Sequence, residues 1–398
     1  MTSTATADDA RLLFVINNDF GELSLAMLFV HGRGLASRTT VMLPPRLFKL
    51  NGGGLPVRTL PYASVDDLTR AIEAEAPDVV IFFSAYLLPA HGLISAAELE
   101  RLLGVLRNRG CRVATSDPFW GLLTAPAPLP PRLKSLMNVA AALNDLVHLF
   151  LAPMELEGVC CVSFFNPSFV DARVAPIPDA FWHAAGVSRA SSHSRFWLFP
   201  ITGEDYNTQV RLSSKGRFAD GVARLLEDAL SAGRWPVLLA PAECIRGVAS
   251  RFQYADAAAL IPYCDLHLFT SLLVHAEHVF NWNAGSTSGH VRMLRGLSQF
   301  SFDSGHVGRV VEGWLQQTGR HYFCGRHLPG LDQSARLIPE NLEERDAAFR
   351  PVANDIRRNL ARAPTPEAMI ARVLEGVEPS RGARLSDSRT GDPGDVGH

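Results

Sequence analysis

The amino-acid sequence predicts an α/β protein built from two Rossmann-like domains, each with a doubly wound parallel sheet. Three observations support this fold class. The chain has 398 residues, which is too long for one ordinary domain and suits two. Short apolar runs rich in β-branched residues alternate with helical segments, which is typical of parallel sheets covered by helices. This alternation breaks once, between residues 166 and 194, and then starts again.

The first half opens with an apolar run at residues 11–17, which predicts a buried strand, and a helix is expected at 22–34. Ser64, followed three residues later by Asp67, is typical of a helix N-terminus, and Gly110 is typical of a helix end. We expect further strands at 39–43, 57–60, 78–84, 112–115, 147–151 and 159–163, and further helices at 64–76, 96–109 and 134–144.

The break between the halves carries Pro167, Pro176 and Pro178 and a polar run, and we expect the interdomain linker there. The second half predicts strands at 195–199, 237–240, 276–281 and 297–302, a polar loop at 202–214, and helices at 217–232, 255–260, 266–275, from 285 onward, 307–317, 342–359 and 366–376. The predicted divisions are a first domain at 1–180, a second domain at 181–345, C-terminal helices at 346–376 and a disordered tail at 377–398.

Composition argues against several classes of protein. The formal net charge of −2 provides no strong basic field for nucleic acid. The first ten residues include Asp8 and Asp9 and do not resemble a signal peptide, and no apolar stretch approaches the roughly 20 residues of a membrane helix. The six cysteines form no CxxC pair, so we expect reduced thiols. We therefore expect a soluble, cytoplasmic protein, with a peripheral membrane contact left open.

The most informative segment is the small-residue turn that follows the strand predicted at 276–281. Gly285 and Gly289 lack a Cβ, so a ligand can approach their backbone closely. Hydroxyl groups come from Ser286, Thr287 and Ser288, and one of them can cap the helix that begins there. The amides and positive dipole end of such a helix suit a phosphate group. The alternative is a structural turn without a ligand.

This order of helix, strand, small-residue turn and helix resembles the donor-binding half of GT-B glycosyltransferases. The resemblance covers most of residues 11–375 and implies that the turn holds the diphosphate of a nucleoside-diphosphate sugar, which is a substrate and not a tightly bound cofactor. It also implies that the C-terminal helices cross back to the first domain. The donor-binding residues that it implies in the turn are Asn283, Gly285, Ser286, Thr287, Ser288 and His290.

The same resemblance assigns roles around two further loops. The loop at 202–207 commonly contacts the donor in such enzymes, and Arg211 and Lys215 can neutralise its diphosphate. A solvated polar loop is the alternative there. After the first strand, Asp19 matches the position of the base that deprotonates the acceptor, and Glu22 is the reserve candidate. Capping of the following helix is the other role open to Asp19.

Three more residues are expected to contact the acceptor. Asn18 and Gly21 flank Asp19 in the same loop, and Asp117 ends another predicted strand. An Asp-Pro turn without a ligand is the alternative for Asp117. The sequence contains no Walker loop and no HExxH, GxSxG or DxD motif. We therefore expect metal-independent chemistry.

The sequence thus favours an inverting transfer of a sugar from a nucleoside-diphosphate donor to an acceptor hydroxyl. Two alternatives stay open. One is a UDP-sugar 2-epimerase on the same architecture, which would consume a nucleotide sugar without any acceptor. The other is a non-catalytic nucleotide- or sugar-binding or assembly protein, in which Asp19 would be dispensable.

Overall fold

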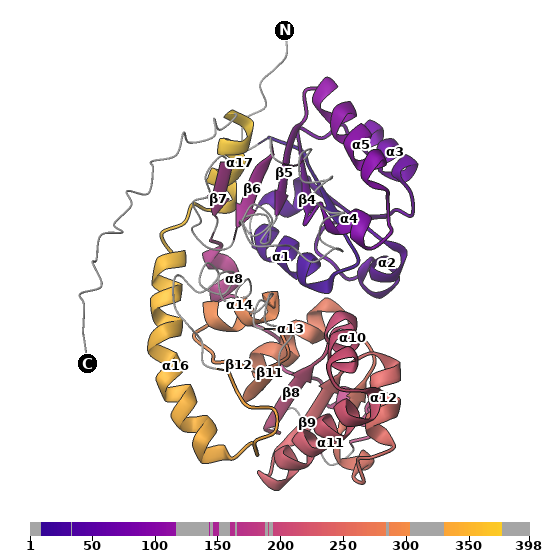
Figure 1. The fold of residues 1–398 in the computed structure, drawn as a ribbon. Helices are drawn as coiled ribbons and strands as arrows, with labels where there is room; N and C mark the ends of the chain where they lie inside the picture. Colours follow the sequence, from indigo (N-terminus) through magenta and orange to yellow (C-terminus); the bar gives the residue numbers. More distant parts are fainter. Residues whose placement is uncertain are drawn as a thin grey trace, which may run out of the picture.

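The structure is a computed structural model, and the residues that it describes are 9–116 (apart from 33), 143, 146–150, 160–163, 165–187, 190, 194–302 (apart from 284 and 285), and 330–375. The described chain forms two parallel sheets with helices packed around them (Figure 1). The predicted two-domain α/β class is therefore confirmed. The helices expected at 134–144 and 307–317 and the tail at 377–398 fall wholly or almost wholly outside the described residues.

The first sheet has seven parallel strands in the order β3-β2-β1-β4-β5-β6-β7. All five residues of β1 are buried, as expected for a central strand covered on both faces. The strand order reverses between β1 and β4, and such a reversal is where ligands bind in open α/β sheets. The strands are β1 (Leu12–Ile16), β2 (Thr39–Leu43), β3 (Arg58–Pro61), β4 (Val79–Phe83), β5 (Arg112–Ser116), β6 (Val147–Phe150) and β7 (Cys160–Ser163).

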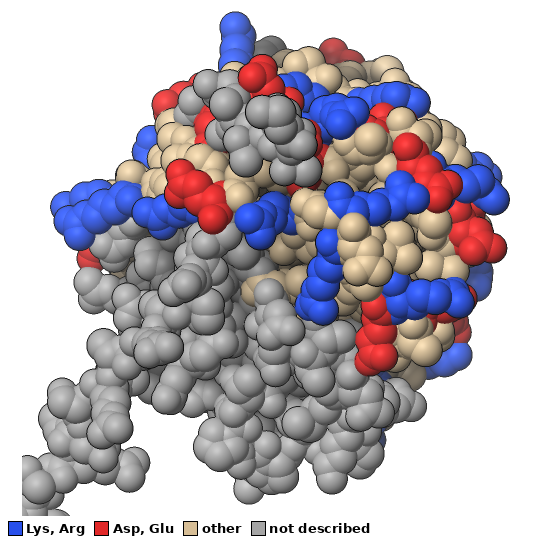
Figure 2. All heavy atoms as spheres, turned by 90° about the horizontal axis from the view of Figure 1, so that it is seen from above, with Lys and Arg blue, Asp and Glu red and all other residues tan. Residues whose placement is uncertain are grey.

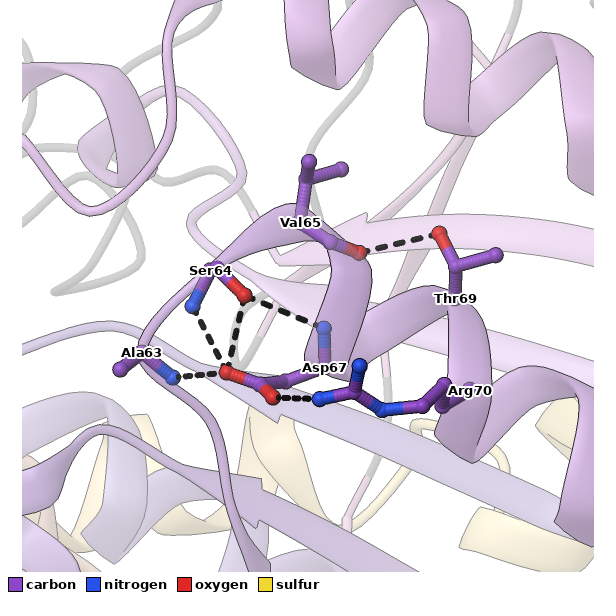
Figure 3. Close-up of polar contacts among 6 residues, drawn as sticks. All are labelled: Ala63, Ser64, Val65, Asp67, Thr69 and Arg70. Atoms are coloured by element: carbon purple, nitrogen blue, oxygen red, sulfur yellow. Dashed lines mark hydrogen bonds and ion pairs between the residues drawn. The ribbon is translucent and has the colours of Figure 1, made fainter.

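Helices α1 (Phe20–Val30), α2 (Pro45–Asn51), α3 (Val65–Glu75), α4 (Leu87–Ala90) and α5 (Ala96–Asn108) connect these strands, with a 3₁₀ turn at Gly34–Arg38. The start of α3 shows how the sequence sets a helix end. Ser64 accepts a hydrogen bond from the Asp67 N–H at 3.2 Å, and the Asp67 carboxylate accepts from the Ser64 N–H at 3.0 Å (Figure 3). This reciprocal pair is a capping box, and it lies at the helix N-terminus that the sequence predicted.

The second sheet has five parallel strands in the order β10-β9-β8-β11-β12. Its order reverses between β8 and β11, so the second domain repeats the doubly wound plan of the first. The strands are β8 (Phe196–Pro200), β9 (Trp235–Leu239), β10 (Ala259–Ile261), β11 (His278–Asn281) and β12 (Phe300–Ser301). The helices are α10 (Gly203–Leu212), α11 (Lys215–Ser231), α12 (Ala242–Ala249), α13 (Leu266–His275) and α14 (Thr287–Leu294).

Two predicted elements of the second domain are wrong. The polar loop expected at 202–214 is helix α10, which starts with a capping box between Thr202 and Asp205. Hydroxyl and carboxylate groups here satisfy helix amides instead of facing solvent in a loop. The helix expected at 255–260 is a short 3₁₀ turn, Ala255–Ala257, followed by edge strand β10, which pairs with β9.

The remaining described helices connect the two domains. Helices α8 (Pro167–Asp171) and α9 (Asp179–Ala184) occupy the segment predicted as the linker. Helix α16 (Pro339–Leu360) lies beside α14 of the second domain, and α17 (Pro366–Glu375) packs against β4 and β5 of the first (Figure 1). The buried Met369, Ile370 and Val373 of α17 belong to the same apolar cluster as Phe14 and Ile81.

One apolar core runs through both domains. Its first-domain members include Leu23 and Met27 of α1, and its second-domain members include Leu273 of α13 and Val291 and Leu294 of α14. Helices α1 and α14 are in direct contact, and Figure 1 places α14 at the boundary between the two sheets. Burial of apolar surface, at about 25 cal/mol per Å², therefore stabilises the contact between the domains as well as each domain.

The described surface carries charges of both signs. On the face seen in Figure 2, Lys and Arg side chains are interspersed with Asp and Glu side chains. Some charged side chains of the described residues form ion pairs, such as Arg58–Glu75 at 2.9 Å and Arg109–Glu73 at 2.8 Å. Among the described residues, no helix has the length and hydropathy needed to cross a membrane.

Candidate functional site

Asp19 lies at the carboxyl end of β1, at the N-cap of α1. Its Oδ1 accepts a hydrogen bond from the Gly21 N–H at 2.8 Å, so the capping role foreseen for Asp19 is present. The side chain keeps solvent access, yet protein surrounds it closely enough that desolvation raises the pKa of Asp19. The bond from Gly21 acts in the opposite direction and lowers this pKa. An accessible carboxylate in such a partly desolvated place is suited to accept a proton.

Charged groups from both domains act on Asp19. Besides desolvation and the Gly21 bond, the electrostatic contributions to the Asp19 pKa come from His91 and Arg46 of the first domain and from Asp205 of the second. Asp205 belongs to α10, which follows β8 directly. Asp19 therefore lies within electrostatic range of the segment that follows β8. The Phe20 ring also contacts Phe269 of α13, edge to face, at 5.3 Å between centroids.

The other predicted residues of the first domain lie as follows. Asn18 is half-buried beside Asp19, and Gly21 supplies the capping N–H. Glu22 is only 7% exposed, and its two carboxylate oxygens accept from Ser84 Oγ at 2.8 Å and Ser116 Oγ at 3.0 Å. Asp117 lies outside the described residues.

In the second domain, the predicted donor turn leads into α14 at the carboxyl end of β11. Ser286 takes the N-cap position with extended backbone angles, and its carbonyl accepts from the Gly289 N–H at 2.9 Å. The Ser286 N–H donates in turn to the half-buried Asn283 carbonyl at 3.2 Å. Gly285 lies outside the described residues, as do the side chains of Thr287, Ser288 and His290, whose backbone forms the first turns of α14.

Packing against a neighbouring side chain explains why position 289 is a glycine, and the sequence did not reveal this. A Cβ at this position would lie 2.1 Å from Nε2 of the buried Gln299. The Gln299 Oε1 accepts from Asn281 Nδ2 at 3.0 Å, which fixes the amide against the helix. The missing Cβ of Gly289 therefore accommodates Gln299, whereas the sequence suggested that it admits a ligand.

Two arginines of α14 do not add charge at the helix start. Arg292 is 1% exposed and donates to the carbonyls of Ser298 at 2.6 Å, Ala276 at 3.0 Å and Leu273. Burial lowers the pKa of Arg292 to about 9. Arg295, at the C-cap, donates to the carbonyls of α8 and its flank. Both side chains hold α14 in place.

Arg211 and Lys215 are exposed and already engaged. The Arg211 guanidinium donates to the Asn207 carbonyl at 3.2 Å and to Thr208 Oγ1 at 3.1 Å, on its own helix. Lys215 Nζ lies 2.5 Å from Glu243 Oε1, and both side chains are more than half exposed. An anionic ligand would have to compete with these partners.

Helices α1 and α14 meet at α8 through their C-terminal ends. Asn166, just before α8, donates to the carbonyls of Leu28 at 2.8 Å and His31 at 3.0 Å. Arg295 Nη2 donates to the Phe169 carbonyl at 2.6 Å, and the Phe169 ring contacts the His31 ring at 5.5 Å between centroids. Both helices therefore extend away from α8, and their N-terminal ends carry Asp19 and Ser286.

The sequence missed several residues at the domain boundary. Arg46 stacks over the Tyr263 ring at 4.7 Å, His267 Nε2 lies 2.7 Å from the Gly54 carbonyl, and Asn51 Oδ1 accepts from the Leu266 N–H at 2.8 Å. No local pattern marks these residues, because each pair joins positions far apart in the chain. In the described part of the chain, no three His, Cys, Asp or Glu side chains are grouped so that they could hold a metal ion.

Neither the protein-family models nor the curated protein sequences contain a match to this chain. Among solved structures, Os79 from O. sativa in complex with UDP and deoxynivalenol-3-glucoside is similar over 92% of this chain and 99% of its own, with 12% identity and a TM-score of 0.53. The UDP-GlcNAc 2-epimerase of Neisseria meningitidis bound to UDP-GlcNAc covers 92% and 97%, with 11% identity and a TM-score of 0.50.

A third similar structure, the glycosyltransferase SnogD from Streptomyces nogalater, covers 92% of this chain and 99% of its own, with 14% identity and a TM-score of 0.47. At such identities, structural similarity speaks to the fold alone. The chain has a GT-B-like fold. This conclusion rests on the two doubly wound parallel sheets, on the C-terminal helices that contact both domains, and on the agreement with the Os79 and epimerase structures over nearly their whole lengths.

Proposed function

We propose that this protein is a GT-B-type glycosyltransferase that moves a sugar from a nucleoside-diphosphate donor to an acceptor hydroxyl. The observation that carries the proposal is the arrangement of α1 and α14. The two helices pack together, share an anchor at α8 through their C-terminal ends, and carry Asp19 and Ser286 at their N-terminal ends. A carboxylate on one domain and a helix N-terminus on the other are the two groups that sugar transfer needs.

The proposed mechanism is direct displacement with inversion. The donor diphosphate lies at the start of α14, where backbone amides and the helix dipole stabilise the charge that grows on the leaving group. The contacts proposed there involve Asn283, Gly285, Ser286 and the first residues of α14, including His290. No metal ligand is assigned in this mechanism.

Asp19 takes the proton of the acceptor hydroxyl as the new glycosidic bond forms. The raised pKa of Asp19 supports this role, because a general base works best when its pKa is closer to the working pH. Asn18, Gly21 and Asp117 are proposed to contact the acceptor. Arg211 and Lys215 are proposed to contribute long-range positive charge to the donor side, in competition with the neighbours they already contact.

Two experiments in sequence test this proposal. A thermal-shift screen with UDP, GDP, dTDP and CMP identifies the nucleotide, and a stabilisation by one of them fixes the donor class. Transfer from the corresponding nucleotide sugar is then measured for the wild type and Asp19→Asn. We expect the substitution to lower the turnover rate by about 10²–10⁴-fold while the nucleotide still stabilises the protein. Full activity in Asp19→Asn would remove Asp19 from the mechanism.

A UDP-sugar 2-epimerase is the second candidate, because the Neisseria meningitidis epimerase matches this chain over a similar length. The discriminating observation is consumption of a nucleotide sugar by the pure protein without any acceptor. A C2 epimer as the product would replace the transferase proposal. Absence of any nucleotide-dependent shift in melting temperature would instead favour a non-catalytic protein.

A further inference from the structure

Within the described part of the chain, the buried carboxylate of Glu22 joins three chain segments at the carboxyl edge of the first sheet. Glu22 stands in the first turn of α1, three residues after Asp19. It accepts from Ser84 Oγ, just beyond the end of β4, and from Ser116 Oγ, the last residue of β5. Ser84 and Ser116 are 0% and 1% exposed, so these hydrogen bonds form away from solvent. Burial of a carboxylate is costly unless it is hydrogen-bonded in this way.

Ser84 has an unusual backbone conformation that depends on the same group. Its φ of 51° lies in the left-handed region, which is unfavourable for a residue that carries a Cβ. The Ser84 N–H donates to the Ser116 carbonyl at 2.6 Å and to Ser116 Oγ at 3.1 Å, while its hydroxyl donates to Glu22. The surrounding hydrogen bonds therefore hold a strained turn in place. Strain of this kind persists where neighbouring contacts determine the conformation.

The loop that carries Asp19 is tied to the same edge from its other side. Asn17 Oδ1 accepts from the Asp19 N–H at 2.6 Å, and Asn17 Nδ2 donates to the Phe83 carbonyl at 2.8 Å. The Tyr62 hydroxyl donates to the Ile16 carbonyl at 2.5 Å. Asp19 thus lies between two fixed points, Asn17 before it and Glu22 after it. Both of them connect to the end of β4.

We propose that Glu22 is a positioning residue that fixes Asp19 relative to the ends of β4 and β5. The proposal rests on the proposed function, in which Asp19 is the base. Glu22 itself is unsuited to that role, because both of its oxygens accept hydroxyl hydrogen bonds inside the protein. It acts through geometry: its bonds to Ser84 and Ser116 set the direction in which α1 begins and hence the place of Asp19.

The kinetic test compares Glu22→Gln, Ser84→Ala and Ser116→Ala with Ser24→Ala. The amide that replaces the carboxylate in Glu22→Gln can accept through only one of its two polar atoms, so one serine loses its acceptor. Ser24 is the matched control, since it lies on the same helix and its hydroxyl donates to the Phe20 carbonyl instead. We expect the three test variants to lower kcat by about 10-fold or more, because small displacements of a reacting group are costly. Ser24→Ala should keep wild-type kcat.

The readout must separate positioning from loss of folding. The donor site lies on the other domain, so the shift in melting temperature produced by the nucleotide, and KM for the donor, should stay at wild-type values in all four variants. A lowered kcat together with an unchanged donor KM supports positioning. Wild-type kcat in folded Glu22→Gln and Ser84→Ala would overturn the proposal.

A second measurement does not depend on turnover. Carbon-13 NMR of the aspartate carboxyl groups, with the Asp19 signal assigned by its loss in Asp19→Asn, gives the Asp19 pKa directly. Ser84→Ala and Ser116→Ala leave the charge of Glu22 unchanged, so they alter only its hydrogen bonds. If the Asp19 pKa falls toward its ordinary value in these variants, the loop that carries Asp19 has moved into solvent. An unchanged Asp19 pKa in both would overturn the proposal. If the wild type transfers no sugar, the proposed function fails, and this titration still decides whether Glu22 positions Asp19.

Discussion

The side-chain oxygen of Asn51 accepts a hydrogen bond from the backbone N–H of Leu266 at 2.8 Å, and this bond joins the two domains. Asn51 ends α2 in the first domain and is 3% exposed, whereas Leu266 begins α13 in the second. The same Asn51 amide donates to the Leu47 carbonyl at 3.2 Å, so the side chain is held in one orientation. The domains are thus in contact through specific polar groups as well as through the shared apolar core.

Asn51→Ala is expected to weaken the contact between the domains. It leaves the Leu266 N–H buried without its acceptor, and an unsatisfied group of this kind costs about 1–3 kcal/mol. The urea midpoint for unfolding should fall accordingly. The control is Asn108→Ala, at the exposed end of α5, for which we expect a change within about 0.5 kcal/mol. Equal midpoints for Asn51→Ala and the wild type would contradict this account of the interface.

Arg292→Met should destabilise the second domain strongly. The substitution leaves the carbonyls of Leu273, Ala276 and Ser298 without their common donor. Each buried acceptor left unsatisfied in this way costs about 1–3 kcal/mol. Thermal unfolding of Arg292→Met and of Arg217→Met, an exposed arginine on α11, provides the comparison. If Arg292→Met loses no more stability than Arg217→Met, the buried guanidinium of Arg292 is not needed for the stability of the second domain.

The protein should become less stable as the pH is lowered, because His278 is buried in its neutral form. This side chain is 7% exposed among Trp197, Phe280 and Phe300, and burial lowers its pKa to about 4 from the ordinary 6.5. As the pH drops below 6.5, the unfolded chain binds a proton at His278 and the native protein does not. The contribution is therefore fully present above pH 6.5 and is lost between pH 6.5 and about 4, by up to about 3 kcal/mol.

Urea unfolding at pH 7.5 and pH 5 checks this prediction for the wild type and His278→Phe. Phenylalanine has no proton to bind, so the difference in stability between the two pH values should shrink in the variant. Carboxyl groups contribute equally to both proteins and cancel in this comparison. An identical pH dependence in wild type and His278→Phe would show that His278 is not responsible.

Gly289→Ala tests whether position 289 must be glycine in order to leave room for Gln299. The added methyl group would overlap the Gln299 amide, and such overpacking typically costs about 1–3 kcal/mol. Adding Gln299→Ala removes the overlap, so we expect the double variant to recover much of the loss in melting temperature that Gly289→Ala alone causes. No recovery in the double variant would point to another reason for glycine here.

The sequence predicted the strands well where burial is continuous. The run at 11–17 and the run at 78–84 correspond to β1 and β4, because fully buried parallel strands are apolar on both faces. It predicted α10 wrongly because its polar residues were assigned to a loop, although Thr202 followed by Asp205 is a capping signature. Edge strand β10 has three residues, too few for a periodic pattern.

The candidate site was predictable only in its local features. The sequence points to Asp19 and to the turn at Ser286 because each lies between a strand and the helix that follows it. The hydrogen-bond partners of Glu22 could not be predicted, because Ser84 and Ser116 are 62 and 94 residues away from it in the chain. The burial of Arg292 was not predictable either, because its carbonyl partners Ala276 and Ser298 lie outside α14.

The most direct test of the central claim is the binding of the nucleoside diphosphate selected by the screen to Ser286→Asp. Aspartate caps a helix about as well as serine does, so α14 should stay folded, but its charge opposes a phosphate at the helix start. Isothermal titration calorimetry should show affinity at least 10-fold weaker than in the wild type, while Ser95→Asp, at the N-cap of α5 in the other domain, keeps wild-type affinity. Undiminished binding in Ser286→Asp would contradict the assignment of the donor diphosphate to the start of α14.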